Sequence, residues 1–172
     1  MIHRISLSGS AINEIVRVAI QGYEAPYKEE RLGILLGRFF RGIAQVEQAI
    51  IYGGGKRTRS EATVDPHKFE RRVNDLQHEM GLSFLGSFHT HNEIASTISS
   101  TLSQADKTPL CENLPALIEV IAAIWVSNGP LRQAQSYLQM STDDGYRVRM
   151  AGYGCQQGFE CLPVWHASAR SA

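Results

Sequence analysis

Residues 82–91 of the chain read Leu-Ser-Phe-Leu-Gly-Ser-Phe-His-Thr-His, and the interpretation of the whole sequence starts from this stretch. Its apolar residues predict a strand over Leu82–Thr90. One face of that strand would carry Leu82, Phe84, Gly86 and Phe88. Alternate side chains of an extended backbone point to the same side, so we expect the imidazoles of His89 and His91 to lie close enough to share one metal ion.

The histidine pair has two interpretations. Two histidines one residue apart are often ordinary packing or surface residues. The position of this pair favours ligand binding, because the apolar strand gives way to a polar segment, Asn92–Leu102, and binding sites are common on such loops. Asp106 could add a hard oxygen ligand. Two histidines, one carboxylate and a water would form a four-coordinate zinc site with an open, catalytic position.

Ser103 and Asp106 form a Ser-x-x-Asp pattern that also has a structural interpretation. Serine followed three residues later by an acidic residue is a helix-start pattern of the capping-box kind. Both interpretations can hold, because a helix start is a rigid way to aim a hydroxyl and a carboxylate into a cleft. Glu30 lies in the charged run 28–31, and nothing in the local sequence distinguishes it from Glu29.

Periodicity predicts the remaining elements. Apolar residues at helical spacing predict one helix that starts with a Ser10 cap and ends near Gly22, and a second over Pro66–Met80 with Met80 in its buried stripe. Strands are predicted over 2–7, 32–39, 43–52, 118–126, 132–140, 146–150 and 159–164. With no linker or repeat, we expect a single domain over residues 1–172, with its core over about 1–150 and a C-terminal strand and tail over 151–172.

Composition and charge restrict the class of protein. The 172 residues are 43% hydrophobic and 20% charged, and 17 basic residues balance 17 acidic ones. This composition is typical of a soluble globular domain, and it gives no overall attraction to nucleic acid or to an anionic membrane. No apolar run has the length of a signal peptide or a membrane span. The three cysteines are an odd and sparse set, so we expect a cytoplasmic protein without a disulfide framework.

Three segments together resemble a known motif. They are Glu30-Arg31-Leu32-Gly33-Ile34-Leu35-Leu36-Gly37, Gly86-Ser87-Phe88-His89-Thr90-His91 and Ser103-Gln104-Ala105-Asp106. In this order they resemble the JAMM motif of the MPN-domain (JAB-type) zinc metalloproteases, and a compact chain without extra modules favours a prokaryotic single-domain member. The resemblance implies an α/β (α+β) fold, a single MPN-type domain whose central mixed β-sheet is flanked by helices.

The resemblance also implies a role for each motif residue. Glu30 corresponds to the general acid/base and Ser103 to the residue that stabilises the oxyanion. One Zn2+ per chain would be held by His89, His91 and Asp106. Two features differ from the family pattern. Asn92 stands where many members have proline, and the eleven residues 92–102 between the second histidine and the serine form a longer loop than is usual.

By this resemblance the protein would be a zinc-dependent peptidase or isopeptidase. It would cleave after the C-terminal tail of ubiquitin or of a ubiquitin-like protein of the sulfur-carrier type, with residues 92–102 as a flap over the tail. The alternative is a catalytically silent scaffold that binds partners, although such proteins generally lack one or more motif residues that this chain keeps. A zinc deaminase is disfavoured, because the sequence contains no Cys-x-x-Cys pair. The oligomeric state is not determined by the sequence.

Overall fold

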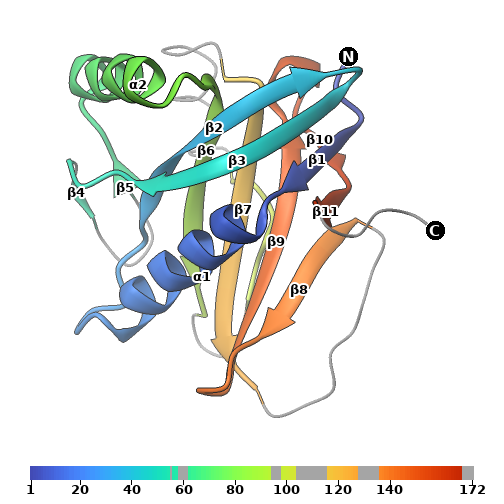
Figure 1. The fold of residues 1–172 in the computed structure, drawn as a ribbon. Coiled ribbons are helices and arrows are strands. Elements are labelled where there is room, and N and C mark those ends of the chain that lie inside the picture. The colour runs from blue at the N-terminus through green and yellow to red at the C-terminus, as the bar shows by residue number, and fades with distance from the viewer. Residues whose placement is uncertain (55, 58–61, 94–97, 104–115, 128–135, 168–172) are drawn as a thin grey trace.

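The computed structural model describes residues 1–54, 56–57, 62–93, 98–103, 116–127 and 136–167 (Figure 1). Within these ranges the chain forms eleven strands, two α-helices and one short 3-10 helix. In chain order the elements are β1 (Arg4–Leu7), α1 (Gly9–Glu24), β2 (Leu32–Phe40), β3 (Ile43–Ile51), β4 (Lys56–Arg57), β5 (Ala62–Thr63), α2 (Pro66–Met80), β6 (Ser83–Asn92), β7 (Ile118–Val126), β8 (Tyr137–Ser141), β9 (Tyr146–Gly154), η1 (Cys155–Gln157), β10 (Glu160–Leu162) and β11 (Val164–His166).

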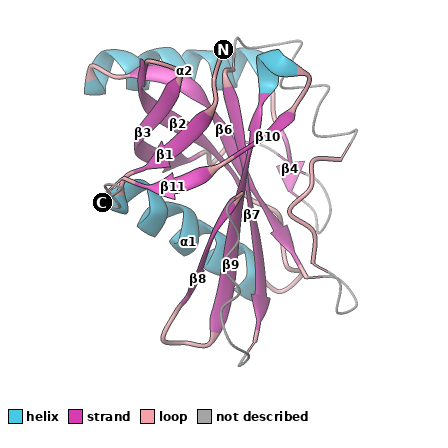
Figure 2. Ribbon diagram, turned by 90° about the vertical axis from the view of Figure 1, so that its right-hand side faces the viewer, coloured by secondary structure: helices cyan, strands magenta, loops and turns pink. Residues whose placement is uncertain are grey.

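Nine of these strands form one mixed sheet, in the order β10-β9-β7-β6-β2-β3-β1-β11, with β8 also paired to β9. The pairs β6 with β7, β1 with β3 and β1 with β11 are parallel. β10 and β11 are the two ends of this order, yet only Pro163 separates them in the chain. Because Cα atoms two residues apart are at most roughly 7 Å from each other, the sheet curls until its ends meet. The result is the nearly closed, barrel-like sheet of Figure 2.

The predicted α/β class, with a central sheet flanked by helices, is wrong. The described residues are mostly β, and they contain only two α-helices. The physical reason is the curl of the sheet, which lets strands from its two halves line one shared core, so that few helices are needed to cover it. In the part of the chain that the structure describes, no helix is long and apolar enough to cross a membrane.

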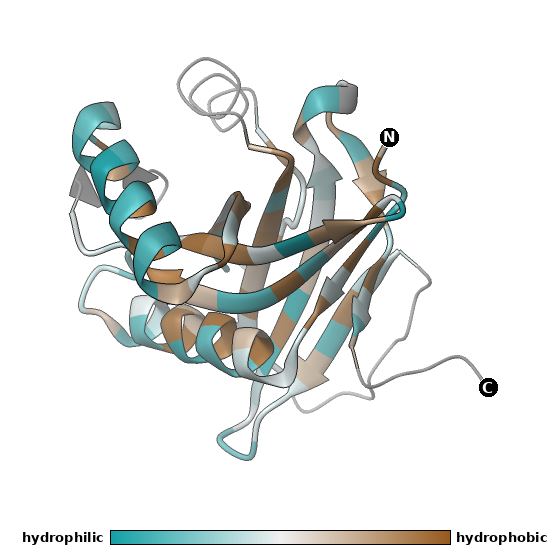
Figure 3. Ribbon diagram, turned by 45° about the horizontal axis from the view of Figure 1, so that its top comes forward, coloured by the Kyte–Doolittle hydropathy of each residue, from teal (hydrophilic) through white to brown (hydrophobic). Residues whose placement is uncertain are grey.

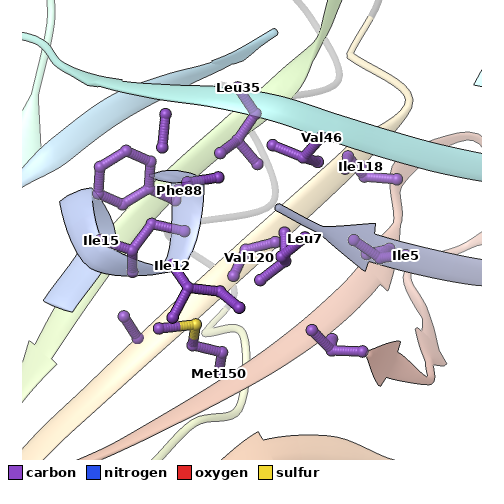
Figure 4. Packing of buried hydrophobic residues seen from close by; sticks show 14 of the residues in the cluster. Ile5, Leu7, Ile12, Ile15, Leu35, Val46, Phe88, Ile118, Val120 and Met150 are labelled. Carbon is purple, nitrogen blue, oxygen red and sulfur yellow. The ribbon is translucent and has the colours of Figure 1, made fainter. Parts of the chain in front are cut away.

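The larger core lies between α1 and the concave side of the sheet. Figure 4 shows Ile12 and Ile15 of α1 directed toward Phe88, Val120 and Met150, which come from three different strands. The helix begins two residues earlier than its predicted Ser10 cap, because the Ser8 hydroxyl accepts a hydrogen bond from the N–H of Ala11. Figure 3 shows hydrophobic residues gathered on the central strands and on the side of α1 that faces them.

A smaller core lies under α2 on the opposite face of the sheet. Phe69, Val73 and Leu76 of α2 are buried there against Ile34 and Leu36 of β2. The predicted helix bounds are confirmed, because Asp65 caps the first turn and Gly81 ends the helix in the left-handed conformation. Met80 is 40% exposed, so its predicted place in the buried stripe is wrong.

β6 changes face part-way along its length. The predicted single face with Phe84 and Phe88 is wrong, because Phe84 packs in the α2 cluster and Phe88 in the α1 core. The pairing with β2 explains this, since Gly86 and Phe84 pair with consecutive residues of β2 and Leu85 is left over as a β-bulge.

The bulge determines where the candidate site lies. Phe88 points into the α1 core, and alternate residues of a strand point to opposite faces. Ser87, His89 and His91 therefore share the other face of β6, away from α1. Without the extra residue at the bulge, the same apolar pattern would turn the two histidines into the core.

Gly86 is expected to be intolerant of any side chain. An added β-carbon there would overlap the carbonyl oxygen of Ile118, where β6 passes close to β7. We predict that Gly86→Ala lowers the free energy of unfolding by about 3 kcal/mol, measured by urea denaturation.

Gly53→Ala is the matched control, because its added β-carbon would meet no atom within 4 Å. It should change the free energy of unfolding by less than about 0.5 kcal/mol. Equal stabilities of the two variants would contradict the close approach of β6 and β7.

Candidate metal centre

The end of β6 brings the two predicted histidine ligands together. His89 is 6% exposed and His91 is partly buried. Their Nε2 atoms are 3.0 Å apart, and their ring planes are inclined by 57° with centroids 4.8 Å apart. Two imidazoles bound to one tetrahedral zinc ion would have Nε2 atoms roughly 3.3 Å apart. The pair is therefore close to the geometry that a shared zinc ion requires.

Each ring is oriented through its other nitrogen. Nδ1 of His89 lies 2.7 Å from Oε1 of Glu119, and Nδ1 of His91 lies 3.0 Å from the backbone carbonyl oxygen of Ser99. A carbonyl oxygen and an ionised carboxylate only accept hydrogen bonds, so both Nδ1 atoms donate. In a neutral imidazole the hydrogen on Nδ1 leaves Nε2 unprotonated. This pair of hydrogen bonds selects the tautomers in which both Nε2 atoms are available as ligands.

The chemistry of these two nitrogens fits a metal ion. At 3.0 Å the two Nε2 atoms are at hydrogen-bonding distance, and a proton or a metal ion held between them relieves the repulsion of their lone pairs. Imidazole nitrogen is a preferred zinc ligand, and ligating histidines almost always donate their other N–H to a carboxylate, a backbone carbonyl or water. His89 and His91 show the first two of these arrangements. The residues present therefore fit zinc.

Glu119 is the site residue that the sequence analysis missed. It is fully buried as the second residue of β7, and the parallel register pairs it with Ser87 of β6. The Ser87 hydroxyl donates to Oε2 of Glu119 at 2.5 Å, while Oε1 accepts from His89. The sequence feature that could have pointed to Glu119 is a single carboxylate in an otherwise apolar predicted strand. A buried glutamate needs partners for its charge, so such a residue is a candidate for a site.

Glu30 approaches the histidines from the neighbouring strand. It precedes β2 and is 7% exposed. Leu32 pairs with His89 in the antiparallel register of β2 and β6. If this register continued two residues beyond β2, Glu30 would stand opposite His91. The structure shows Glu30 buried in the segment that leads into β2, and its place beside the predicted metal ligands stays a prediction.

The segment that carries Glu30 is tied to the other face of β6. Thr90 donates its N–H to the carbonyl oxygen of Arg31 and accepts the N–H of Arg31 on Oγ1, both at 2.8 Å. The buried side chain of Asn92 donates from Nδ2 to the carbonyl oxygen of Lys28 at 2.7 Å. Proline at this position would lack that donor. Asn92 is therefore a structural tie for the segment 28–31.

Ser103 lies at the end of a segment that is held against the site. Tyr153 of β9 donates its hydroxyl to the carbonyl oxygen of Ser100 at 2.7 Å, next to the carbonyl oxygen of Ser99 that His91 contacts. Burial raises the pKa of the Tyr153 phenol, which favours the neutral form that donates this bond. Ser103 itself is exposed, three residues beyond this anchor.

Asp106, the third predicted ligand, lies outside the described residues. Within the described ranges, no group of three or more His, Cys, Asp or Glu side chains is arranged to hold a metal ion. The structure brings together His89 and His91, and it shows the buried Glu30 and the segment that leads to Ser103. That His89, His91 and Asp106 together bind a metal ion stays a prediction.

Fold and site together describe a mostly-β protein with a curled mixed sheet and a histidine pair at the end of a central strand. Neither a protein-family model nor a curated protein matches the chain. Among solved structures, the solution structure of protein DSY2949 from Desulfitobacterium hafniense is similar, with a TM-score of 0.63 and 18% sequence identity over 94% of this chain and 92% of that one. At this identity the similarity shows a common fold alone.

We predict that Asn92→Ala loosens the segment that carries Glu30. The variant loses the hydrogen bond to the Lys28 carbonyl and leaves that oxygen without its donor, so the free energy of unfolding should fall by about 1–2 kcal/mol. Hydrogen exchange of the Arg31 amide, which donates to Thr90, should become faster in the same variant. Urea denaturation and exchange monitored by NMR would measure the two effects.

Asn74→Ala is the matched control, because Asn74 is an exposed residue of α2. It should change the free energy of unfolding by less than about 0.5 kcal/mol. Unchanged exchange of the Arg31 amide in Asn92→Ala would show that Asn92 does not hold this segment.

Proposed function

We propose that the protein is a zinc-dependent peptidase or isopeptidase that cleaves after the C-terminal tail of ubiquitin or of a ubiquitin-like protein. The observation that carries the metal part is the pair of Nε2 atoms 3.0 Å apart, in rings whose Nδ1 atoms are each held by an acceptor. The order of Glu30, His89-Thr90-His91 and Ser103-Gln104-Ala105-Asp106, which resembles the JAMM motif, supports the reaction type and the substrate class.

In this proposal His89, His91 and Asp106 hold one zinc ion per chain. Bound zinc supplies a Lewis acid that polarises a carbonyl group and lowers the pKa of water toward neutrality. The Glu30 carboxylate takes a proton from the attacking water and returns it to the leaving amine. The Ser103 hydroxyl donates a hydrogen bond to the oxygen that becomes negatively charged when the carbonyl carbon is attacked.

The contacts of the two neighbouring glutamates support Glu30, rather than Glu29, as the proton carrier. Glu29 forms an ion pair with Arg31 at 3.0 Å and is partly exposed. Glu30 is 7% exposed and lies two residues before Leu32, which pairs with His89. A carboxylate held in a water-poor position beside the metal ligands is better suited to proton transfer than one neutralised by a guanidinium group.

The proposed partner is a ubiquitin-like protein or its conjugates, bound through an extended tail. A net charge of zero gives no reason to propose a nucleic acid or a membrane as a partner. We also propose the cytoplasm as the location, in keeping with the free thiols of Cys155 and Cys161.

We predict that Glu30→Gln keeps zinc but loses turnover. The substitution removes the proton-carrying group and leaves the metal ligands in place, so cleavage of a ubiquitin-like fusion should fall by at least about 100-fold. Zinc content and cleavage would be measured on the same samples, with and without a chelator. Glu29→Gln is the matched control one residue away, and its rate should stay within about twofold of the wild type.

Asp106→Ala should show the opposite pattern, with weaker zinc binding because a ligand is lost. The wild type should contain about one zinc ion per chain, and its cleavage should be sensitive to the chelator. Unchanged cleavage by Glu30→Gln would contradict the proposed role of Glu30. Stoichiometric zinc in a wild type that cleaves no ubiquitin-like fusion would contradict the proposed substrate class but not the metal site, whereas a wild type that binds no zinc would favour the scaffold alternative.

A further inference from the structure

The carboxylate of Glu119 is enclosed in a position where an apolar side chain would be expected. Its exposed fraction is 0%, and Ile121 and Ala123, which follow at alternate positions on the same face of β7, are also completely buried. Both carboxylate oxygens are engaged, Oε1 with Nδ1 of His89 at 2.7 Å and Oε2 with the hydroxyl of Ser87 at 2.5 Å. Both of these hydrogen bonds lead to β6, the strand that carries the histidine pair.

Stability alone does not account for this carboxylate. A buried ion pair or hydrogen-bonded charge is often no more stabilising than apolar residues of similar volume, because the charge has to be removed from water. If this position of β7 had only a structural role, an aliphatic side chain would therefore fill it equally well. The charge acts on the two groups that the carboxylate contacts, the hydroxyl of Ser87 and the ring of His89, and of these only His89 is a predicted metal ligand.

We infer that Glu119 is a positioning residue for the metal site, which holds His89 as the Nδ1–H tautomer and makes its Nε2 a stronger metal ligand. The inference rests on the proposed function, since it deepens the description of the same site. A carboxylate acceptor fixes the rotation of a ligating imidazole, and its negative charge raises the electron density on the opposite nitrogen.

Ser87 completes this arrangement by fixing the carboxylate itself. The parallel register places Ser87 directly beside Glu119, and Ser87 and His89 lie two residues apart on the same face of β6. Glu119 thus accepts one hydrogen bond from each of two neighbouring side chains of one strand. A carboxylate bound at both oxygens cannot rotate away from the imidazole without losing a buried hydrogen bond.

Two substitutions of Glu119 separate its charge from its hydrogen bond. Glu119→Gln keeps an oxygen that can accept from His89 and an amide that can donate to Ser87, but it removes the negative charge. Glu119→Met removes both the charge and the acceptor while nearly conserving volume, which a buried position tolerates well. Glu47→Gln is the control, because Glu47 is a surface carboxylate of β3 paired with Arg38.

The zinc dissociation constant would be measured for each purified, metal-free protein by competition with a chromogenic chelator. We expect it to rise about 10-fold in Glu119→Gln and about 100-fold in Glu119→Met. Ser87→Ala should raise it less than Glu119→Gln, and Glu47→Gln should leave it unchanged. Circular dichroism and urea denaturation would establish that each variant is folded before its affinity is interpreted.

A second readout does not depend on bound metal. Two-bond 1H–15N correlation spectra of the metal-free protein report which nitrogen of His89 carries the hydrogen. We expect the Nδ1–H form in the wild type and in Glu119→Gln, and a shift toward the Nε2–H form in Glu119→Met. A merely structural role of Glu119 would leave this tautomer unchanged in a folded variant.

The outcomes separate this inference from the proposed function. Zinc binding by the wild type with equal affinity in both folded Glu119 variants would overturn the inference and leave the zinc hydrolase proposal intact. No zinc binding by the wild type would overturn both. Zinc binding that is weaker in Glu119→Gln and weaker still in Glu119→Met, together with the tautomer shift in Glu119→Met, would establish Glu119 as the residue that positions His89.

Discussion

The register of β6 between β2 and β7 is the constraint on which the site depends. Pairing with β7 sets Ser87 beside Glu119, and pairing with β2 brings the segment of Glu30 alongside His91. The bulge in β6 determines which face the histidines occupy, and the opposite face is fixed by its packing against α1. A slip of one residue would turn the imidazoles into that core, so the apolar packing and the site chemistry depend on the same pairing.

Local periodicity predicted the elements of this fold better than their arrangement. The strand over 118–126 and the helix over Pro66–Met80 are confirmed, because each has a clear apolar pattern and, for the helix, capping residues. The class was wrong because the curl of the sheet depends on pairing between distant segments. The single strand predicted over 159–164 is two strands, β10 and β11, which Pro163 separates and which pair at opposite ends of the sheet.

The candidate site also contains residues that the local sequence pattern predicts and residues whose contacts depend on pairing between distant segments. His89 and His91 could be found from the sequence, because alternation along one strand is enough to put two imidazoles together. Glu119 could be noticed as a carboxylate in an apolar strand, but its contact with His89 could not be predicted, since it requires the register of β6 against β7. The local sequence did not distinguish Glu29 from Glu30; the motif resemblance chose Glu30, and the structure adds that Glu30 is buried whereas Glu29 is paired with Arg31.

The central claim, that His89 and His91 bind one metal ion through their Nε2 atoms, is tested most directly by X-ray absorption at the zinc edge. The measurement would use the wild-type protein loaded with one equivalent of zinc. The account predicts a four-coordinate ion with two imidazole nitrogens at about 2.0–2.1 Å and oxygen in the remaining positions, with the imidazole signal lost when both histidines are replaced by alanine. An ion surrounded by oxygen alone, or by cysteine sulfur, would contradict it.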